Sequence, residues 1–183
     1  MREWAFRMRG GLWTGLFVVI LFMLEPATPV RVCACLALVL LGQAWRCWAV
    51  GYIGLYRGEN VKANTLATHG PYALMRNPLY FGNFVIGFGW SILAGLKGIL
   101  IFTVCFYVLY VLVIIPHEES FLLSKFGGEY EEYCGRVKRF WPSRVSMHDL
   151  RGKFDSGVVM RSEIHTIIST ITGTVIILAV SLV

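Results

Sequence analysis

Apolar residues dominate this chain in long runs, and short polar segments separate the runs. A helix needs about 20 mostly apolar residues to cross the hydrocarbon core of a bilayer, and five runs come near that length. The pattern therefore predicts an all-α integral membrane bundle with about five transmembrane helices. We expect these helices over residues 10–30, 30–50, 79–96, 98–116 and 164–183.

Composition agrees with a protein of the bilayer. Of the 183 residues, 56% are hydrophobic and 15% are charged, whereas a soluble domain carries roughly 45–50% apolar and about 25% charged residues. The five cysteines form no CxxC spacing, so the sequence predicts neither a disulfide framework nor a metal site. No strand–glycine-loop–helix unit of a soluble nucleotide-binding fold is present.

The basic residues predict the orientation in the membrane. If the N-terminus is cytoplasmic, all of the 17 Lys and Arg except Arg31 and Lys97 lie on the cytoplasmic side, as the positive-inside rule requires. The C-terminus is then expected on the opposite side. The net charge of +6 is typical of a protein that meets anionic lipid headgroups, and it does not indicate nucleic-acid binding.

Two long polar segments, 57–78 and 117–163, face the cytoplasm in this topology. The helices expected at 79–96 and 98–116 are joined by a tight loop, so they form an antiparallel hairpin whose cytoplasmic ends are neighbours. These ends carry the polar groups of 77–82 and 117–119. Two polar clusters that converge at one face of the bilayer predict a cytoplasmic binding site.

The chain is expected to divide into three parts. Residues 1–142 form the membrane core, 143–163 form a polar linker at the surface, and 164–183 form an additional C-terminal transmembrane helix. In that last helix Ser169 and Gly173 have the small-xxx-small spacing that favours helix pairing, which suggests a homodimer.

Two motifs in the polar segments resemble a known family. The patterns are Gly-Pro-Tyr-x-x-x-Arg-(His/Asn)-Pro-x-Tyr-x-Gly and Glu-Glu-x-x-Leu-x-x-x-Phe-Gly-x-x-Tyr-x-x-Tyr-x-x-x-Val-x-Arg-x-x-Pro. They resemble the isoprenylcysteine carboxyl methyltransferases and their relatives, the phospholipid methyltransferases of membranes. The first motif is matched by Gly70, Pro71, Tyr72, Arg76, Asn77, Pro78, Tyr80 and Gly82. The second is matched by Glu118, Glu119, Leu122, Phe126, Gly127, Tyr130, Tyr133, Val137, Arg139 and Pro142.

The resemblance implies an S-adenosylmethionine-dependent methyltransferase. The cofactor would lie between the inner ends of the hairpin, covered by 120–142, and would methylate a lipophilic acceptor that enters from the bilayer. The candidate acceptors are a prenyl-thioether carboxylate, an aminolipid headgroup or another apolar small molecule. Glu119 and Arg139 are the candidate catalytic residues. The candidate cofactor-binding residues are His69, Gly70, Pro71, Tyr72, Arg76, Asn77, Pro78, Tyr80, Gly82, Glu118, Glu119 and Tyr130.

The chemistry of methyl transfer is compatible with these residues. A carboxylate against the sulfonium would stabilise the ground state more than the transition state, so Glu118 and Glu119 suit the ribose hydroxyls and the ammonium group of the cofactor. Either acid, or a nearby His, is an alternative acceptor of a proton from the substrate. Arg76 or Arg139 suits the cofactor carboxylate. The tyrosines suit the adenine; they are Tyr72, Tyr80, Tyr130 and Tyr133.

Other interpretations stay open. Asn77 stands where isoprenylcysteine enzymes usually have His, and residues 113–117 lack the Arg that those enzymes tend to carry before the paired acids, so the acceptor is undetermined. An NADPH-dependent reductase of the sterol-reductase type and a non-enzymatic membrane scaffold are the alternatives. Arg139 would also suit a lipid-binding basic patch. Arg46, with Gln43 in the second helix, either lines a substrate cavity or snorkels to the interface.

Overall fold

The computed structural model describes residues 9–53 and 65–182. Within these ranges every regular element is a helix and no strand occurs. The helices are α2 (Arg9–Leu21), α3 (Pro29–Ile53), α4 (Pro71–Leu74), α5 (Pro78–Ile92), α6 (Gly95–Phe106), the π-helix η1 (Tyr107–Ile114), α7 (Ile115–Phe126), α8 (Gly128–Arg136), α9 (Ser156–Ser162) and α10 (Ile164–Ser181).

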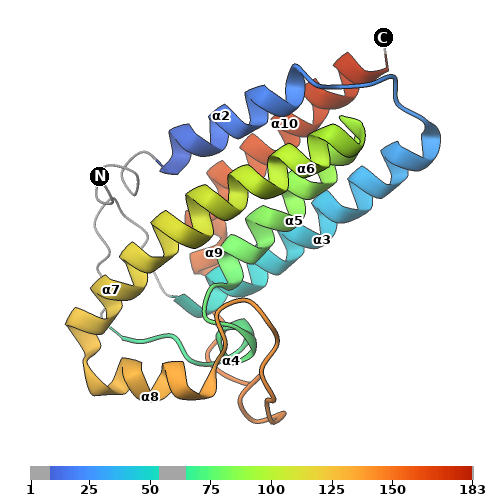
Figure 1. The fold of residues 1–183 in the computed structure, drawn as a ribbon. Coiled ribbons are helices and arrows are strands. Elements are labelled where there is room, and N and C mark those ends of the chain that lie inside the picture. Colours follow the sequence, from blue (N-terminus) through green and yellow to red (C-terminus); the bar gives the residue numbers. More distant parts are fainter. Residues whose placement is uncertain (1–8, 54–64, 183) are drawn as a thin grey trace.

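The long helices run side by side along one axis, and the short ones gather near one end of the bundle (Figure 1). At that end α3 finishes and α5 begins, and α4 and α8 lie close by. The predicted helical membrane bundle is confirmed by this arrangement.

Among the described residues, three helices are long and apolar enough to cross a membrane. They are Pro29–Ile53 with 25 residues, Gly95–Phe126 with 32 and Ile164–Ser181 with 18. In contrast, α2 has 13 residues and α5 has 15, fewer than the roughly 20 that a perpendicular span needs. Two of the five expected spans are therefore shorter than predicted. α2 ends ahead of Glu25-Pro26, and α5 ends ahead of Gly95, whose φ of +64° is a turn conformation.

Glycines let α3 and α5 pack backbone against backbone. A Cβ on Gly42 would lie 2.9 Å from the carbonyl oxygen of Gly82 and 3.0 Å from the nitrogen of Ile86, and one on Gly82 would lie 2.5 Å from Cγ of Arg46. In a membrane, where apolar burial does not drive helices together, such close contact of small residues holds them by dispersion. Because Gly82 has no side chain, the Arg46 side chain can pack directly against the backbone of α5.

The fourth predicted helix, 98–116, is longer than expected. α6, η1 and α7 form one continuous helix from Gly95 to Phe126, so the end that we expected at Pro116 is wrong. Proline breaks a helix in its interior because it lacks an N–H. Here Pro116 lies in the first turn of α7, directly after the π-helical stretch, and the helix continues through it.

The π-helix keeps one stripe of this long helix directed inward. Positions four apart drift by about 40° around an α-helix because a turn has 3.6 residues, so five such steps would rotate the stripe by about 200°. The wider π turn, with hydrogen bonds from i to i+5, offsets part of this drift. Buried or cavity-lining residues accordingly recur at every fourth position, namely Phe102, Phe106, Tyr110, Ile114, Glu118 and Leu122.

Residues 143–163, which we predicted to be a surface linker, are mostly exposed and contain the short helix α9, but they also form specific contacts with the bundle. The N–H of Gly70 donates to the carbonyl oxygen of Asp149 at 2.9 Å, and the N–H of Asp155 donates to that of Gly51 at 2.9 Å. Asp155 also caps α9, since its Oδ1 accepts from the backbone N–H of Gly157. At the end of the segment Glu163 is fully buried. The segment is therefore packed against the bundle.

A pair of glycine substitutions tests the α3–α5 contact. Gly42→Ala places a methyl group within 3 Å of backbone atoms, and overpacking of this kind costs about 1–3 kcal/mol. We expect a lower melting temperature in detergent. Gly15→Ala in α2 is the control, because nothing lies within 4 Å of its added Cβ and alanine is the better helix former. Equal melting temperatures for both variants would contradict the close contact.

Candidate active site

A cavity of about 320 Å³ opens among the helices near the end covered by α4 and α8. Sites for small molecules commonly measure about 300–1,000 Å³. Its lining comes from α2, α3, α4, α5, η1, α7, α8 and α10 and from residues 65–67 and 76–77. The cavity therefore draws on almost the whole described chain.

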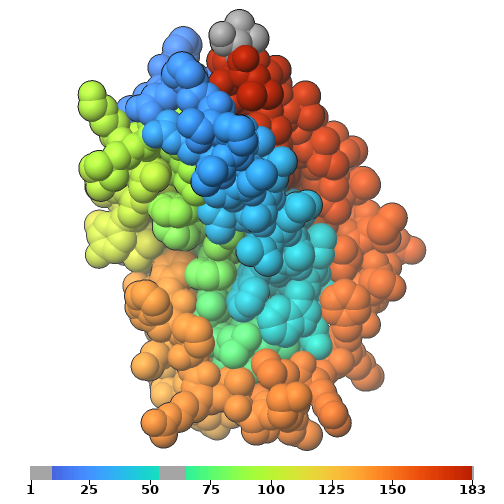
Figure 2. Space-filling view, turned by 90° about the vertical axis from the view of Figure 1, so that its right-hand side faces the viewer, coloured from blue at the N-terminus to red at the C-terminus, as the bar shows by residue number. Residues whose placement is uncertain are grey.

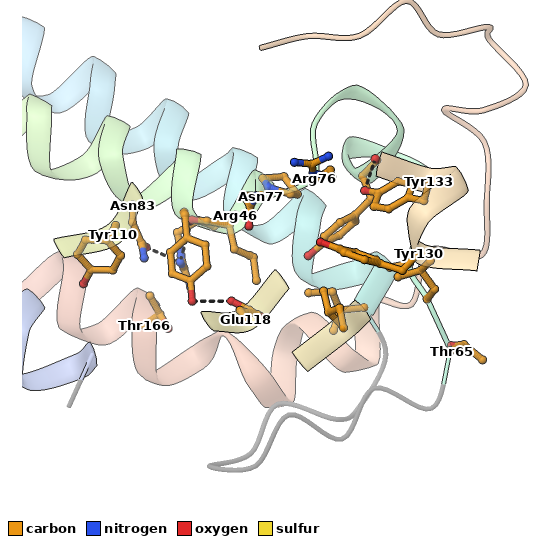
Figure 3. Close-up of a pocket in the computed structure, with 18 of the residues that line it drawn as sticks. Arg46, Thr65, Arg76, Asn77, Asn83, Tyr110, Glu118, Tyr130, Tyr133 and Thr166 are labelled. Atoms are coloured by element: carbon orange, nitrogen blue, oxygen red, sulfur yellow. Dashed lines mark hydrogen bonds between the residues drawn. The ribbon is translucent and has the colours of Figure 1, made fainter. Parts of the chain in front are cut away.

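One end of the cavity, which we call the tyrosine end, contains Tyr72, Tyr130 and Tyr133 with Arg76 and Asn77. Figure 3 shows the rings of Tyr130 and Tyr133 close to one another, with centroids 6.0 Å apart. The hydroxyl of Tyr133 donates to the carbonyl oxygen of Tyr72 at 2.8 Å. This bond ties α8 to α4 and fixes the wall of the cavity.

Turn chemistry places the polar residues of the first motif. Gly70 has a φ of +63°, which a side chain would disfavour, and Pro71 begins α4. Asn77 precedes α5, which Pro78 begins. The backbone N–H of Arg76 donates to the carbonyl oxygen of Lys138 at 2.9 Å. The two motifs, far apart in sequence, are thus joined at this end as the hairpin argument predicted.

Glu119 is the centre of a charged cluster. Its Oε1 accepts from Arg76 Nε at 3.2 Å and from Asn77 Nδ2 at 3.2 Å, and its Oε2 accepts from Arg139 Nη2 at 2.5 Å. One carboxylate therefore meets two guanidinium groups. Arg76 and Asn77 line the cavity, whereas Glu119 and Arg139 are not among its lining residues, so Glu119 lies behind the groups that it orients.

Glu118 takes the position at the cavity that was expected for both acids. Its Oε2 accepts a hydrogen bond of 2.7 Å from the hydroxyl of Tyr80, and both side chains line the cavity. Successive residues of a helix point about 100° apart, which directs Glu118 into the cavity and Glu119 toward the two arginines. Figure 3 shows Glu118 between the tyrosine end and the opposite end.

The opposite end, which we call the Arg46 end, contains Arg46 and Asn83 with Trp13, Tyr110 and Thr166. Arg46 is only 2% exposed, so it lines a cavity and does not snorkel. Its Nε lies 2.7 Å from Oε1 of Glu163, and its Nη1 donates to Oδ1 of Asn83. Sequence reasoning missed Glu163. The signal that could have indicated it is Arg46 itself, because an arginine within a membrane-spanning helix needs a partner of opposite charge.

Several residues of the first motif lie away from the cavity. His69 is exposed, with its Nδ1 3.2 Å from the hydroxyl of Thr68. Gly70 and Pro71 shape the turn into α4, and Gly82 provides the contact with α3. Of the predicted site residues, those that line the cavity are Tyr72, Arg76, Asn77, Pro78, Tyr80, Glu118 and Tyr130.

Burial holds the two phenols of α8 in their neutral form. Desolvation is the main cause that raises the pKa of Tyr130, and the nearby Glu119 carboxylate adds to it. Desolvation also raises the pKa of Tyr133, although the positive charge of Arg76 partly opposes the shift. Both hydroxyls are therefore hydrogen-bond donors at neutral pH.

Comparison with known families identifies this set of residues. The family model described as phospholipid methyltransferase matches residues 30–129, which hold the α3–α5 contact, both motif turns and the two acids. This chain belongs to the phospholipid methyltransferase family. The matched segment ends ahead of Tyr130, Tyr133 and Thr166, which line the cavity. Part of the cavity of this family member therefore comes from outside the matched segment.

Three curated relatives show what the family member is similar to. A cobalt-zinc-cadmium resistance protein of Cupriavidus metallidurans is 36% identical over 112 residues, which are 60% of this chain and 48% of the relative. A Delta(14)-sterol reductase of Mus musculus is 32% identical over 88 residues, 46% of this chain and 20% of the relative. A probable protein-S-isoprenylcysteine O-methyltransferase of Oryza sativa subsp. indica is 34% identical over 108 residues, 56% of each chain.

The matched regions thus span about half of the first and third relatives and a fifth of the second. No solved structure matches the chain. Among the described residues no group of three or more His, Cys, Asp or Glu could hold a metal ion.

Titration of the tyrosines tests the environment of α8. Because their pKa values are raised from the ordinary 10.0, the folded protein keeps protons that the unfolded chain releases. Their contribution to stability is therefore intact below pH 10 and is lost as the pH rises above it. We expect the folded parent and the folded double variant Tyr130→Phe/Tyr133→Phe to show equal tyrosinate absorbance up to about pH 11. After denaturation the absorbance of the parent should exceed that of the variant by the contribution of two tyrosinates. A difference of two phenols in the folded proteins would contradict the burial.

Proposed function

We propose that this family member is an S-adenosylmethionine-dependent methyltransferase that acts on a lipophilic acceptor. The observation that carries the proposal is a single cavity with a tyrosine and arginine end, a carboxylate at its middle and an aromatic end within a membrane bundle. A cofactor with charged and aromatic parts suits the first end. An acceptor that arrives from the bilayer suits the second.

The donor set fits the cofactor. Arg76 offers a guanidinium for its carboxylate, and Tyr72, Tyr130 and Tyr133 offer ring faces and neutral hydroxyls for its adenine. Arg76 Nε bonds Glu119, and its Nη1 donates to the carbonyl oxygens of Cys134 and Val137, each at 3.3 Å. These bonds fix the plane of the guanidinium, and a fixed donor loses little freedom when a ligand binds.

The bound cofactor would supply an electrophilic methyl group, and the protein would mainly position the reactants. Glu118 Oε2 accepts a hydrogen bond of 2.7 Å from the Tyr80 hydroxyl, which fixes the orientation of the carboxylate at the cavity. The oriented carboxylate would accept a hydrogen bond from the cofactor ammonium or a proton from the acceptor. Glu119 then acts as a positioning residue for Arg76 and Asn77, a change from the catalytic role expected of it, and Arg139 supports Glu119 from behind.

The acceptor would enter sideways from the lipid, because the Arg46 end lies among the spanning helices. Trp13 and Tyr110 wall this end, and their ring centroids are 6.2 Å apart. We propose that the tyrosine end faces the cytoplasm, as the distribution of basic residues predicts. A prenyl-thioether carboxylate, an aminolipid headgroup and another apolar small molecule remain the candidate acceptors, and the rice relative's name refers to the first.

A reductase is the second candidate, and the similarity to the mouse sterol reductase favours it. Such an enzyme would bind NADPH at the same end of the cavity. Calorimetry with each cofactor separates the two candidates.

Ligand binding tests the proposed cofactor. We expect detergent-purified protein to bind S-adenosylhomocysteine and to give no heat with NADPH. Arg76→Lys keeps the charge but loses the planar fork, so we expect it to weaken this binding by roughly tenfold, or 1.4 kcal/mol.

The matched control is Arg136→Lys, the same change at a side chain that is 67% exposed and 3.7 Å from Glu132. It should bind as the parent does. Heat with NADPH alone would favour the reductase, and an unaffected Arg76→Lys variant would remove Arg76 from the cofactor site.

A further inference from the structure

The C-terminal part of the chain pairs a buried carboxylate with an arginine that lines the cavity. Glu163 follows α9 and precedes α10, and its side chain is 0% exposed. Its Oε1 lies 2.7 Å from Nε of Arg46 and accepts from Nε2 of Gln43 at 3.3 Å. Figure 2 shows the C-terminal helices lying along α3. Burial of two charges is costly, so this pair calls for an explanation beyond the joining of two helices.

The pair lies at the cavity and not only between helices. Arg46 lines the cavity, and its Nη1 reaches the carbonyl oxygen of Leu79 at 3.4 Å and the side chain of Asn83, which line it too. Thr166, one turn after Glu163, also lines it; residues three apart share a helix face. Figure 3 shows Arg46, Asn83 and Thr166 grouped at the same end.

The two partners come from different parts of the chain. Arg46 lies within the segment that matches the family, 30–129, whereas Glu163 and Thr166 lie beyond its end. The family segment alone would leave the Arg46 guanidinium without this carboxylate. With the C-terminal segment in place, Arg46 is 2% exposed. The C-terminal segment is thus required to balance a charge that the family segment places in the cavity.

That balance matters for a cationic ligand. In a cavity of low dielectric a positive guanidinium repels another positive charge strongly, and S-adenosylmethionine carries a positive sulfonium next to the methyl group that is transferred. The sulfonium has to face the acceptor, which in the proposed function occupies the Arg46 end. S-adenosylhomocysteine has a neutral thioether at the same atom.

We propose that Glu163 is a positioning residue that neutralises Arg46 and so permits the sulfonium cofactor to bind. The inference rests on the proposed function, because it assumes that S-adenosylmethionine occupies the cavity. Glu163 also holds Arg46 against Leu79 and Asn83, but a purely structural role would affect the charged and the neutral cofactor equally. The ratio of their dissociation constants therefore isolates the charge effect.

Calorimetry at constant ionic strength measures this ratio in the full-length protein. Glu163→Gln removes the charge and keeps the size of the side chain. We expect it to weaken binding of S-adenosylmethionine about tenfold relative to S-adenosylhomocysteine, because removal of the carboxylate leaves the Arg46 charge to repel the sulfonium. Arg46→Gln should shift the ratio in the opposite direction. The double variant Arg46→Gln/Glu163→Gln should return it to within about threefold of the parent.

Glu25→Gln is the matched control, because Glu25 forms an ion pair with Arg31 at 2.8 Å where both side chains are more than a third exposed. It should leave the ratio unchanged. Equal weakening of both cofactors by Glu163→Gln, or no change at all, would overturn the proposal while the proposed function stands. If Glu163→Gln does not fold, an unchanged ratio in Arg46→Gln overturns it. If the parent binds neither cofactor, the proposed function fails first.

Discussion

The close contact of α3 and α5 determines where the polar groups of this membrane bundle can lie. Gly42 and Gly82 allow the two backbones to lie close together. The Arg46 side chain therefore packs directly against α5. A buried guanidinium in a bilayer needs an anionic partner, and Glu163 supplies it at 2.7 Å. The close contact of α3 and α5 therefore places a buried positive charge in the family segment. Glu163 of the C-terminal segment supplies the opposite charge.

The long helix from Gly95 to Phe126 determines how the two adjacent acids are used. Its π-helical stretch, Tyr107–Ile114, keeps an inward stripe at every fourth residue, and this stripe continues through Glu118. Glu119 then points to Arg76 and Arg139, where it orients donors without lining the cavity. π-helical turns are frequent at functional sites, and here the turn precedes two adjacent acids of which Glu118 lines the cavity and Glu119 contacts the two arginines.

Much of this arrangement was predictable from the sequence. Apolar runs predicted the helical bundle, and the hairpin argument brought Asn77 and Glu119 together because short loops force helix ends to be neighbours. The helix lengths were less predictable: Pro116 is a helix breaker by local rules, yet the π turn before it lets the helix continue. Glu163 was missed because its burial depends on a partner more than 100 residues away, and no local pattern encodes such a pairing.

Transfer of a labelled methyl group tests the central claim most directly. Purified protein in nanodiscs of total membrane lipid extract, with N-acetyl-S-farnesylcysteine added in a parallel sample, is incubated with S-adenosylmethionine that carries tritium in its methyl group. The account predicts radioactivity in the organic extract of at least one sample, and its loss in Asn77→Leu, whose side chain cannot bond Glu119 as the amide does at 3.2 Å. Cofactor that binds the protein but leaves no label in either organic extract would contradict a methyltransferase that acts on a lipophilic acceptor.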